Sequence, residues 1–414
     1  MNYQRFLDRG AVVPPVVVLG VFNGPNEVGI ARDLGRRGVP VLITDNNGAG
    51  LNVPSRYAAK RLIPDPHHDD QGFLEELERI ARGLRQRAVL FPGRDDYILP
   101  VVGATERLSP YFLMPFAGLA VMTRLLDKWQ QFEAAQRAGV DSPRSALLLS
   151  AADAAAAAGD FAFPAILKPT TAQAGQRELG VKLVSVKTAA ELPEAYERAS
   201  VCGPLLLQEY VPGNDDETYY LGSYLNERSQ PLAVFTGRRL RQYPRGSGAA
   251  RSAESVWVPE VAEAGLRLLR ELGFNGVSHV EFKRDPRDGR YKLIEINARH
   301  YGTHALAAAS GVDLSAAAYY DALGRPFTAP RQREGVRWLM ARRDVPASVQ
   351  EILHGELSPW EWLASLRGTR VDGVFSFDDP LPGLANGVRV SARLARRTVR
   401  IAAQRARRGA ARRS

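Results

Sequence analysis

Acidic and amide side chains recur at regular spacing in two neighbouring segments, residues 279–283 and 290–299. Both segments alternate polar and apolar residues, which predicts the two strands of a β-hairpin. The period of two places Glu295 and Asn297 on one face of the second strand, and strand pairing would bring Glu281 to that face. Two carboxylates and an amide oxygen form a hard-oxygen site suited to a magnesium ion that also holds phosphates.

The rest of the predicted hairpin agrees with this interpretation. Asp288-Gly289 is a favoured pair for the bend between the strands. Arg299 continues the polar face, whereas Ile294 and Ile296 fall on the opposite, apolar face. The alternative is a salt-bridged surface hairpin without a ligand, so the rest of the chain must decide between the two.

The composition is that of an ordinary globular protein. The 414 residues allow two or three domains, with 45% hydrophobic and 24% charged residues. The single cysteine, Cys202, excludes an internal disulfide framework and a cysteine-rich zinc site. Neither a long apolar run nor a signal peptide is visible, so we expect a cytoplasmic enzyme.

The basic charge of the chain is concentrated in its last residues. The formal net charge is +10, and residues 389–414 hold ten arginines and no acid. The rest of the protein is therefore near neutral, and the net charge says nothing about its substrate. A helical wheel separates arginines of this tail from Val390, Leu394 and Ile401.

Three roles of the tail stay open. It could lie weakly on the anionic inner surface of a membrane, bind nucleic acid without specificity, or end the chain as a solvated segment. We expect no specific nucleic-acid partner.

The N-terminal part predicts a parallel α/β unit. Residues 15–19 and 40–44 are apolar strands on either side of a helix, and a further strand spans 88–92. The glycines after the first strand do not fit G-x-G-x-x-G, so dinucleotide binding is weakly supported. Ligands bind beyond the carboxyl ends of such strands, although an acid there also serves as a helix N-cap. The substrate candidates after the third strand are Arg94, Asp95 and Asp96.

Lysines and acids mark the middle of the chain. A helix begins at Asp127-Lys128, and a predicted strand over 164–169 contains Lys168. The next strand, 205–211, carries Gln208-Glu209 and leads into an acidic turn.

This order of parts resembles the ATP-grasp superfamily. The likeness rests on Lys128, FPAILKP over 163–169, LQEYVPG over 207–213 and the hairpin with Glu281 and Glu295. Within that superfamily the chain is most similar to predicted carboxylate–amine ligases related to D-aspartate ligase. Each part alone is a weak signal, but their conjunction at consistent spacing is specific.

The resemblance implies an α/β and α+β fold. A Rossmann-like domain over residues 1–120 would precede a two-lobed ATP-grasp domain over 121–323. The small lobe would end near residue 207, and the large lobe would follow from 208. Residues 324–388 would form a C-terminal extension without an assigned role, and 389–414 the basic tail.

The resemblance also implies the contacts to ATP. Lys128 and Lys168 match the lysines that reach the α- and β-phosphates, where a compact ammonium suits a polyanion. The loop 170–175 would cover the phosphates with backbone N–H groups, and Lys182 would add charge. The residues matched to adenine and ribose are Gln208, Glu209, Tyr210, Val211 and either Asp216 or Glu217.

Metal ligands and catalytic groups follow in the same way. The magnesium ligands, with Mn²⁺ as the other ion considered, would be Glu281, Glu295 and Asn297. Arg299 matches the arginine that stabilises the acyl phosphate. Residues 238–243, which contain three arginines, replace a lysine-containing segment of relatives. One of these arginines, with Arg238 and Arg241 as the candidates, would contact the γ-phosphate or the carboxylate. The His-x3-His pattern of His300 and His304 is a weak zinc signal, so contact with phosphate or substrate, or ordinary packing, is favoured. His300 is the substrate candidate among them.

The activity that the resemblance implies is ATP-dependent ligation. A carboxylate would become an acyl phosphate, and an amine would displace the phosphate. Its small-molecule substrates would be amino acids or compounds of envelope and polysaccharide chemistry, and an oligomer is compatible with the sequence. Two alternatives are a phosphotransferase on the same fold and a non-catalytic nucleotide-binding protein.

Overall fold

The computed structural model describes residues 1–22, 24–48, 50–171, 175, 178–246 and 248–385. The predicted basic tail, residues 389–414, lies outside this part of the chain, as do residues 172–174 of the predicted phosphate loop. Within the described residues no helix has the length and apolar character needed to cross a membrane.

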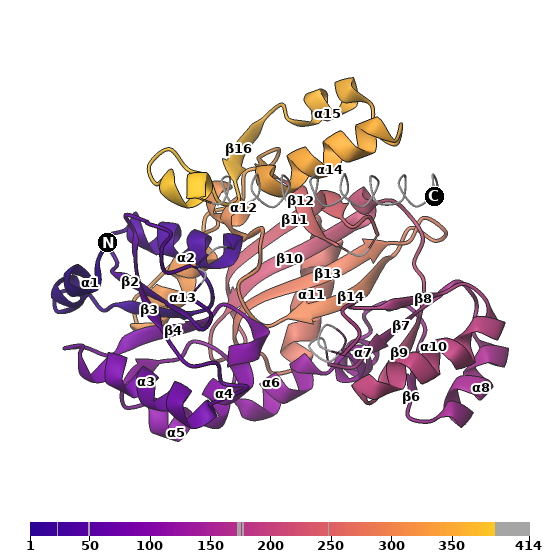
Figure 1. Cartoon of the computed structure of the whole chain (residues 1–414), viewed down its shortest axis with the longest axis horizontal. Coiled ribbons are helices and arrows are strands. Elements are labelled where there is room, and N and C mark those ends of the chain that lie inside the picture. The colour runs from indigo at the N-terminus through magenta and orange to yellow at the C-terminus, as the bar shows by residue number, and fades with distance from the viewer. Residues whose placement is uncertain (23, 49, 172–174, 176–177, 247, 386–414) are drawn as a thin grey trace, which may run out of the picture.

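A five-stranded parallel sheet forms the N-terminal domain, on the left of Figure 1, in the order β3-β2-β1-β4-β5. Its strands are β1 (Val16–Leu19), β2 (Val41–Asp45), β3 (Ala58–Leu62), β4 (Ala88–Pro92) and β5 (Phe112–Leu113). Its helices are α1 (Tyr3–Gly10), α2 (Pro25–Gly35), α3 (Asp70–Arg82), the 3-10 turn η1 (Asp95–Tyr97), α4 (Ile98–Gly103) and α5 (Thr105–Leu108). The predicted βαβ unit is β1-α2-β2. Val16 and Val18 face the side of α2, whereas Val17 and Leu19 face that of α1 and α3, which explains the continuous apolar run.

An antiparallel sheet forms the small lobe, on the right of Figure 1, in the order β6-β9-β7-β8. Helices α6 (Leu119–Leu126) and α7 (Lys128–Arg137) precede it. Its strands are β6 (Ser145–Leu148), β7 (Ala165–Pro169), β8 (Val184–Val186) and β9 (Leu205–Glu209). Its helical segments are α8 (Ala151–Asp160), η2 (Ala189–Glu191), α10 (Leu192–Ala199) and η3 (Ser200–Cys202), and α8 and α10 pack on the sheet through one apolar cluster.

A seven-stranded sheet forms the large lobe, in the order β14-β13-β10-β11-β12-β15-β16. Its strands are β10 (Thr218–Leu225), β11 (Pro231–Tyr243), β12 (Ala249–Ser255), β13 (Gly276–Arg284), β14 (Tyr291–Asn297), β15 (Arg337–Leu339) and β16 (Thr369–Asp372). Its helical segments are η4 (Asp215–Glu217), α11 (Pro259–Glu271), α12 (His304–Ala309), α13 (Leu314–Ala322), α14 (Ala341–Leu353) and α15 (Pro359–Ser365). The last two strands and last two helices come from the predicted extension. Because β15 pairs with β12, the extension continues the sheet of the large lobe.

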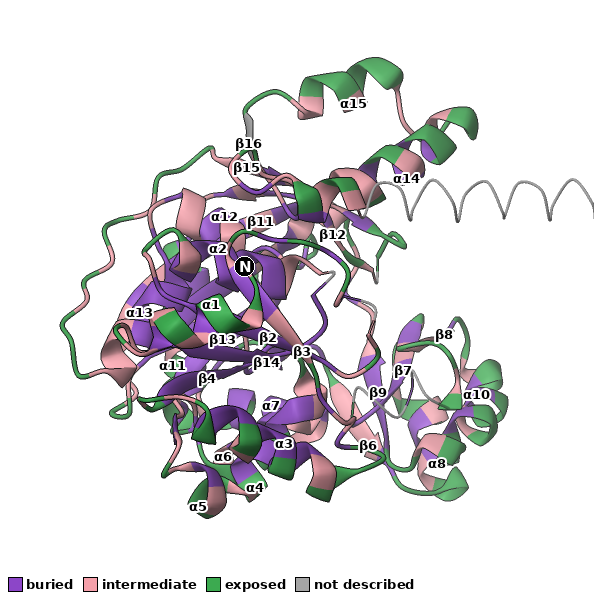
Figure 2. Cartoon of the chain, turned by 60° about the vertical axis from the view of Figure 1, so that its left-hand side comes forward, coloured by how far each residue is buried: buried purple, intermediate pink, exposed green. Residues whose placement is uncertain are grey.

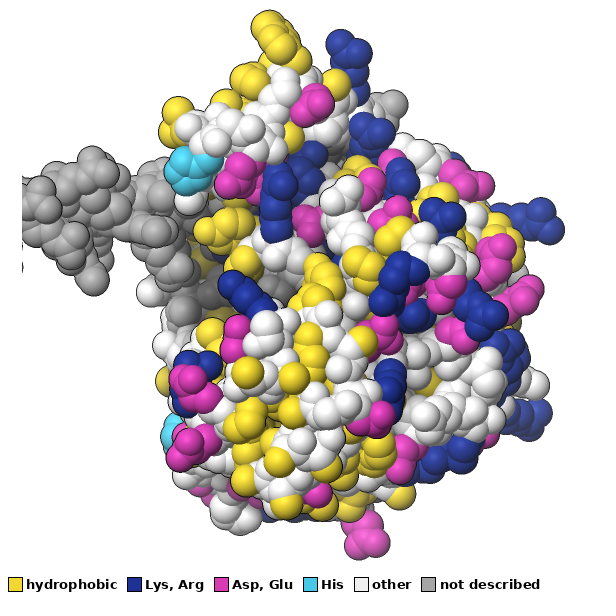
Figure 3. All heavy atoms as spheres, turned by 90° about the vertical axis from the view of Figure 1, so that its right-hand side faces the viewer, with side chains coloured by type: hydrophobic (Ala, Val, Ile, Leu, Met, Phe, Trp, Pro, Cys, Tyr) yellow, Lys and Arg dark blue, Asp and Glu magenta, His cyan; other side chains and the backbone are white. Residues whose placement is uncertain are grey.

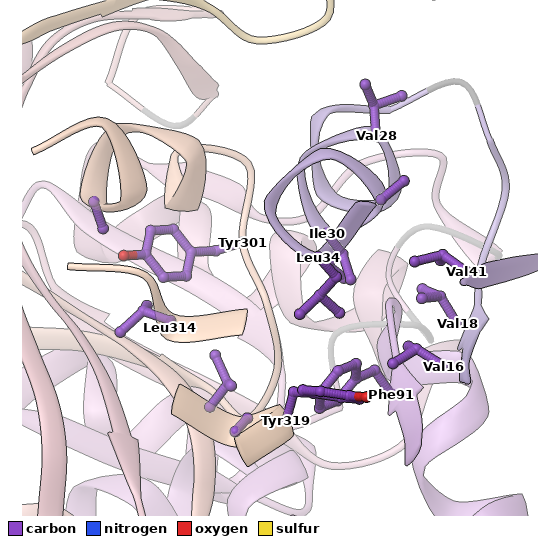
Figure 4. Close-up of a cluster of buried hydrophobic side chains, with 14 of the residues drawn as sticks. Val16, Val18, Val28, Ile30, Leu34, Val41, Phe91, Tyr301, Leu314 and Tyr319 are labelled. Atoms are coloured by element: carbon purple, nitrogen blue, oxygen red, sulfur yellow. The ribbon is translucent and has the colours of Figure 1, made fainter. Parts of the chain in front are cut away.

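The N-terminal domain and the large lobe share one hydrophobic core. Ile30 and Leu34 of α2 lie in the same cluster as Leu314 and Tyr319 of α13 (Figure 4). A β-carbon on Gly29 would lie 2.5 Å from the ring of His304, so glycine permits this close approach of α2 to α12. The packing fixes the N-terminal domain against the sheet that contains β13 and β14. These two strands hold Glu281 and Glu295 and are called the acidic hairpin below.

Buried ion pairs attach the extension to the sheet. Asp344 of α14 is fully buried and accepts hydrogen bonds from Arg241 of β11 (2.8 and 3.1 Å) and from the indole of Trp362 (2.9 Å). Glu351, about two turns further along the same helix, accepts a hydrogen bond from Arg251 of β12 at 2.6 Å. The outer surface of α14 and α15 is exposed (Figure 2), and hydrophobic side chains are visible at the top of the molecule in Figure 3. Trp360 of α15 is 79% exposed.

We expect Asp344→Ala to destabilise the protein, because the substitution leaves Arg241 without its buried carboxylate. Loss of one partner of a buried pair costs about 3–5 kcal/mol in the free energy of unfolding. Urea denaturation followed by circular dichroism measures the change. The control is Glu194→Ala, which removes the exposed pair with Arg198 and should cost less than about 1 kcal/mol. Equal effects of the two substitutions would contradict this account.

Candidate active site

One cavity of about 320 Å³ receives side chains from every part of the fold. The N-terminal domain contributes Pro25 and Asp95, and the extension contributes residues of β15 and α14. The remaining lining comes from the small lobe and from the face of the large sheet that turns toward it. The predicted residues that line it are Asp95, Lys128, Lys168, Lys182, Gln208, Glu209, Tyr210, Val211, Glu281, Glu295, Asn297 and Arg299.

A short stretch of backbone pairing brings the two predicted phosphate lysines into this cavity. The N–H of Lys128 donates to the carbonyl of Thr170 at 2.9 Å, which holds the start of α7 against the end of β7. Lys128 and Lys168 are only 9% and 8% exposed. The Lys168 ammonium donates to Gln208 Oε1 at 2.9 Å, and Gln208 lies opposite Ile166 in the sheet.

Burial lowers the pKa of both lysines. It lowers the pKa of Lys168 to about 7, with the neighbouring Lys128 acting in the same direction and Glu295 opposing it. Burial also lowers the pKa of Lys128, although Glu295 acts against the shift. A polyanion bound here would compensate both charges, as the resemblance to ATP-grasp proteins implies.

The acidic hairpin has the predicted register with one irregularity. Glu281 of β13 lies opposite Glu295 of β14, and Asn297 Nδ2 donates to Glu295 Oε1 at 3.1 Å. The next pair is Phe282 with Leu293, so the register skips Ile294 and forms a bulge. The prediction that Ile294 lies on the apolar face opposite Glu295 is therefore wrong: Ile294 lines the cavity together with Glu295, and Leu293 packs in the core.

The two carboxylates are held in different electrostatic surroundings. Burial raises the pKa of Glu281, while Arg239, whose Nη2 lies 2.9 Å from Glu281 Oε1, opposes the shift. At Glu295 burial acts in the same direction, but Lys128 and the hydrogen bond from Asn297 outweigh it and lower the pKa to about 2. Both acids therefore depend on nearby positive charge.

These residues fit a divalent cation that also binds phosphate. Two carboxylates and the amide oxygen of Asn297 supply hard oxygen ligands at one place. Within the described residues no group of three or more His, Cys, Asp and Glu is arranged to hold a metal alone. An ion at Glu281 and Glu295 would thus complete its coordination from a phosphate or water.

The arginine that reaches the cavity from β11 is Arg239, whereas the two predicted candidates, Arg238 and Arg241, do not line it. Arg238 points to Glu254 at 2.6 Å, and Arg241 to Asp344 of the extension. The reason is strand alternation combined with an irregular register between β11 and β12, where Arg239 pairs with Ala253 and Arg241 with Ser252.

Arg299 faces the cavity and is engaged by the N-terminal domain. Its Nε and Nη2 donate to Asp95 Oδ1 and Oδ2 at 2.7 and 2.9 Å, a bidentate pair. Asn26 strengthens the same junction, since its side-chain amide donates to the carbonyls of Gly93 and His300. The end of β4 therefore meets the end of the acidic hairpin at the cavity.

The other substrate candidates lie outside the cavity. Arg94 and Asp96 pair with each other at 2.7 Å, and neither lines it. His300 is 1% exposed, contacts Ser315 Oγ at 3.2 Å and packs edge-on against the ring of Phe91. Burial keeps the pKa of His300 well below its usual value, and the residue does not line the cavity.

The end of the small-lobe sheet supplies the predicted adenine side. Gln208 to Val211 line the cavity, but Asp216 and Glu217 do not. Asp216 is exposed, and Glu217 lies 3.8 Å from Arg284. Their neighbour Asp215 instead accepts hydrogen bonds from Gln242 and Gly246, which anchors the turn between β11 and β12.

Several lining residues were absent from the predicted set. They include Thr218, Arg239, Gln242, Lys283, Trp338, Met340 and Arg343. Lys283 had a signal in the sequence, because it follows Glu281 with the period of two. Residues of β15 and α14 had none, since only long-range strand pairing brings them to the site.

Comparison with known proteins agrees with the geometry. Residues 224–341 match a family profile described as ATP-grasp in the biosynthetic pathway with Ter operon. The chain is 24% identical to D-aspartate ligase of Enterococcus faecium over 284 residues, which cover 64% of this chain and 66% of that enzyme.

Solved structures share the architecture. L-amino acid ligase from Bacillus licheniformis superimposes with a TM-score of 0.57 at 14% identity, covering 75% of this chain and 74% of that one. The ADP complex of N5-carboxyaminoimidazole ribonucleotide synthetase gives 0.61 at 14% identity, covering 83% and 86%. These findings confirm the predicted resemblance: the chain has the ATP-grasp fold. Its N-terminal α/β domain precedes the two lobes, as the resemblance implied.

Proposed function

We propose that the chain is an ATP-dependent ligase that activates a carboxylate as an acyl phosphate and joins it to an amine. The observation that carries the proposal is the convergence of Lys128, Lys168, the Glu281–Glu295 pair and Arg299 on one cavity. The names of two relatives, D-aspartate ligase and L-amino acid ligase, support an amino acid as one substrate.

ATP would lie between the small lobe and the large sheet. Residues 208–211 would meet the adenine, and Lys128 and Lys168 the α- and β-phosphates. Lys182 is exposed at the rim and would add positive charge. Mg²⁺, or Mn²⁺ in its place, would be held by Glu281, Glu295 and Asn297 and would neutralise phosphate charge.

The chemistry requires positioning and charge compensation. A carboxylate oxygen bonds to the γ-phosphorus as the bond to the bridging oxygen breaks, and ADP leaves. The amine nitrogen then bonds to the carbonyl carbon, the bond from that carbon to phosphate oxygen breaks, and the nitrogen loses a proton. Arg299 has the bidentate geometry to bind the carboxylate and the acyl phosphate once it exchanges Asp95 for substrate.

Turnover should depend on both a carboxylate and an amine. An ADP-release screen of amino acids in pairs, with hydroxylamine present to trap an acyl phosphate, measures this directly. Glu295→Ala should lower the rate by about 100-fold or more, because it removes a ligand of the metal ion that would neutralise the phosphates. Glu263→Ala, on the exposed surface of α11, is the control. A stable phosphorylated acceptor would instead identify a phosphotransferase, and an active Glu295→Ala enzyme would refute the metal assignment.

Nucleotide affinity should fall as the pH rises above about 7. Lys168 is half deprotonated near pH 7 in the free protein, and bound phosphates raise its pKa, so binding takes up a proton. The Kd of Mg·AMP-PNP, measured by calorimetry between pH 6.5 and 9, should rise by up to about tenfold per pH unit. Lys168→Arg keeps its charge and should show a weaker pH dependence, whereas Lys187→Arg should behave as wild type. Parallel curves for all three proteins would contradict this role.

Arg239 and Arg238 form a matched pair for testing the corrected assignment. Arg239→Gln should lower kcat/KM by about 100-fold, because this guanidinium lies at Glu281 inside the cavity. Arg238→Gln breaks the pair with Glu254, outside the cavity, and should retain most of the activity. Steady-state kinetics on both variants, with circular dichroism as a check of folding, decides the assignment. A larger loss of activity in Arg238→Gln than in Arg239→Gln would support Arg238 as the arginine of the site.

A further inference from the structure

The extension supplies one wall of the active cavity. Register places Arg239 of β11, Ala253 of β12 and Trp338 of β15 in one row across the sheet, on the same face. Adjacent strands lie about 4.8 Å apart, so Trp338 stands about 10 Å from Arg239 along this face. Met340 and Arg343, which follow on α14 and its entry, also line the cavity.

Trp338 carries an unused hydrogen-bond donor. Its side chain is 1% exposed, and its indole N–H has no partner among the described residues. Met340, at 1% exposure, lies beside it and gives the wall an apolar surface. A buried donor without an acceptor costs free energy, which a bound acceptor would recover.

Arg343 carries an unused positive charge at the same wall. Within the described part of the chain its guanidinium has no hydrogen bond or ion pair, in contrast to the arginines around it. Arg241, Arg245 and Arg251 each pair with Asp344 or Glu351 of the same helix. Arg343 is exposed as a residue, and partial desolvation by the surrounding protein lowers the pKa of its guanidinium, with no carboxylate opposing the shift.

Helix α14 presents Arg343 from a fixed position. The next residue, Asp344, is held by Arg241 and by the indole of Trp362. In its later turns the helix is attached to β12 through Ser348 and Glu351, which both accept hydrogen bonds from Arg251. In Figures 1 and 2 the helix lies beside β12. Arg343, in its first turn, lines the cavity.

The other cations of the cavity have partners or an assigned ligand. Arg239 pairs with Glu281, Arg299 with Asp95, and the two buried lysines would serve the phosphates. We propose that Trp338, Met340 and Arg343 form a subsite for the anionic group of the amine substrate, such as the carboxylate of an amino acid or a phosphonate in its place. The inference rests on the proposed ligase function and names the class of its second substrate. Its binding test does not need turnover.

The test measures binding of three amines to the full chain loaded with Mg·AMP-PNP. Glycine, aminomethylphosphonate and glycinamide, and the same series built on alanine, differ only in the charge and kind of the second group. Calorimetry should detect the carboxylate or phosphonate member in the wild type and the carboxamide much more weakly. The stronger of the two anions identifies the source of the negative charge.

Arg343→Gln should weaken binding of the anionic amine by about 10- to 100-fold and leave the carboxamide unchanged, as expected for loss of a charge-assisted hydrogen bond. Arg343→Lys should recover part of the loss, and Trp338→Phe should weaken binding by about 2- to 10-fold. Arg270→Gln, on the exposed end of α11, is the control.

Three results would overturn the subsite. The first is that the wild type binds no anionic amine. The second is that Arg343→Gln affects charged and neutral amines equally. The third is that the same variant has a higher Kd for Mg·AMP-PNP itself. A failure of the ligase function looks different, because wild-type ADP release would then not depend on any carboxylate–amine pair.

Discussion

Two lysines and two carboxylates share one cavity, where Lys128 and Lys168 face Glu295 and Arg239 pairs with Glu281. Burial by itself would favour the neutral form of all four side chains. Lys128 outweighs burial at Glu295 and keeps that carboxylate ionised, while Glu295 opposes the loss of charge on Lys168. These groups come from the start of α7, the small lobe and the large lobe. Their ionisation therefore depends on how the two lobes are placed, and a nucleotide with a divalent cation would change the charges of all of them together.

Two arginines that line the cavity are paired with carboxylates of the protein itself. Glu281 engages Arg239 within the large sheet, and Asp95 engages Arg299 across the junction with the N-terminal domain. Each pair keeps a guanidinium at the place where substrate charge would develop, at the cost of breaking an ion pair on binding. The shared core between α2 and α13 gives this arrangement its rigidity, because it fixes the end of β4 against the end of the hairpin.

Local patterns predicted the parts of the site that lie on single elements. The lysine in FPAILKP, residues 208–211 in LQEYVPG and the polar face of the acidic hairpin all line the cavity. Predictions failed where alternation was interrupted or where a choice between neighbours was needed. A bulge turned Ile294 to the cavity, an irregular register selected Arg239 over Arg238 and Arg241, and Asp216, Glu217 and His300 proved to lie outside. Such irregularities depend on the partner strand, which a single sequence does not name.

The sequence by itself determined the chemistry available and the order in which its elements follow. Residue types at a period of two, and a short motif at a strand end, are properties of neighbouring residues, so they can be read along the chain. Only the tertiary structure decided which faces meet. It joined Asp95 to Arg299, and it added β15 to the sheet so that Trp338 and Arg343 reach the cavity. Those contacts arise from strand register and from burial between segments far apart in the chain, where spacing carries no information.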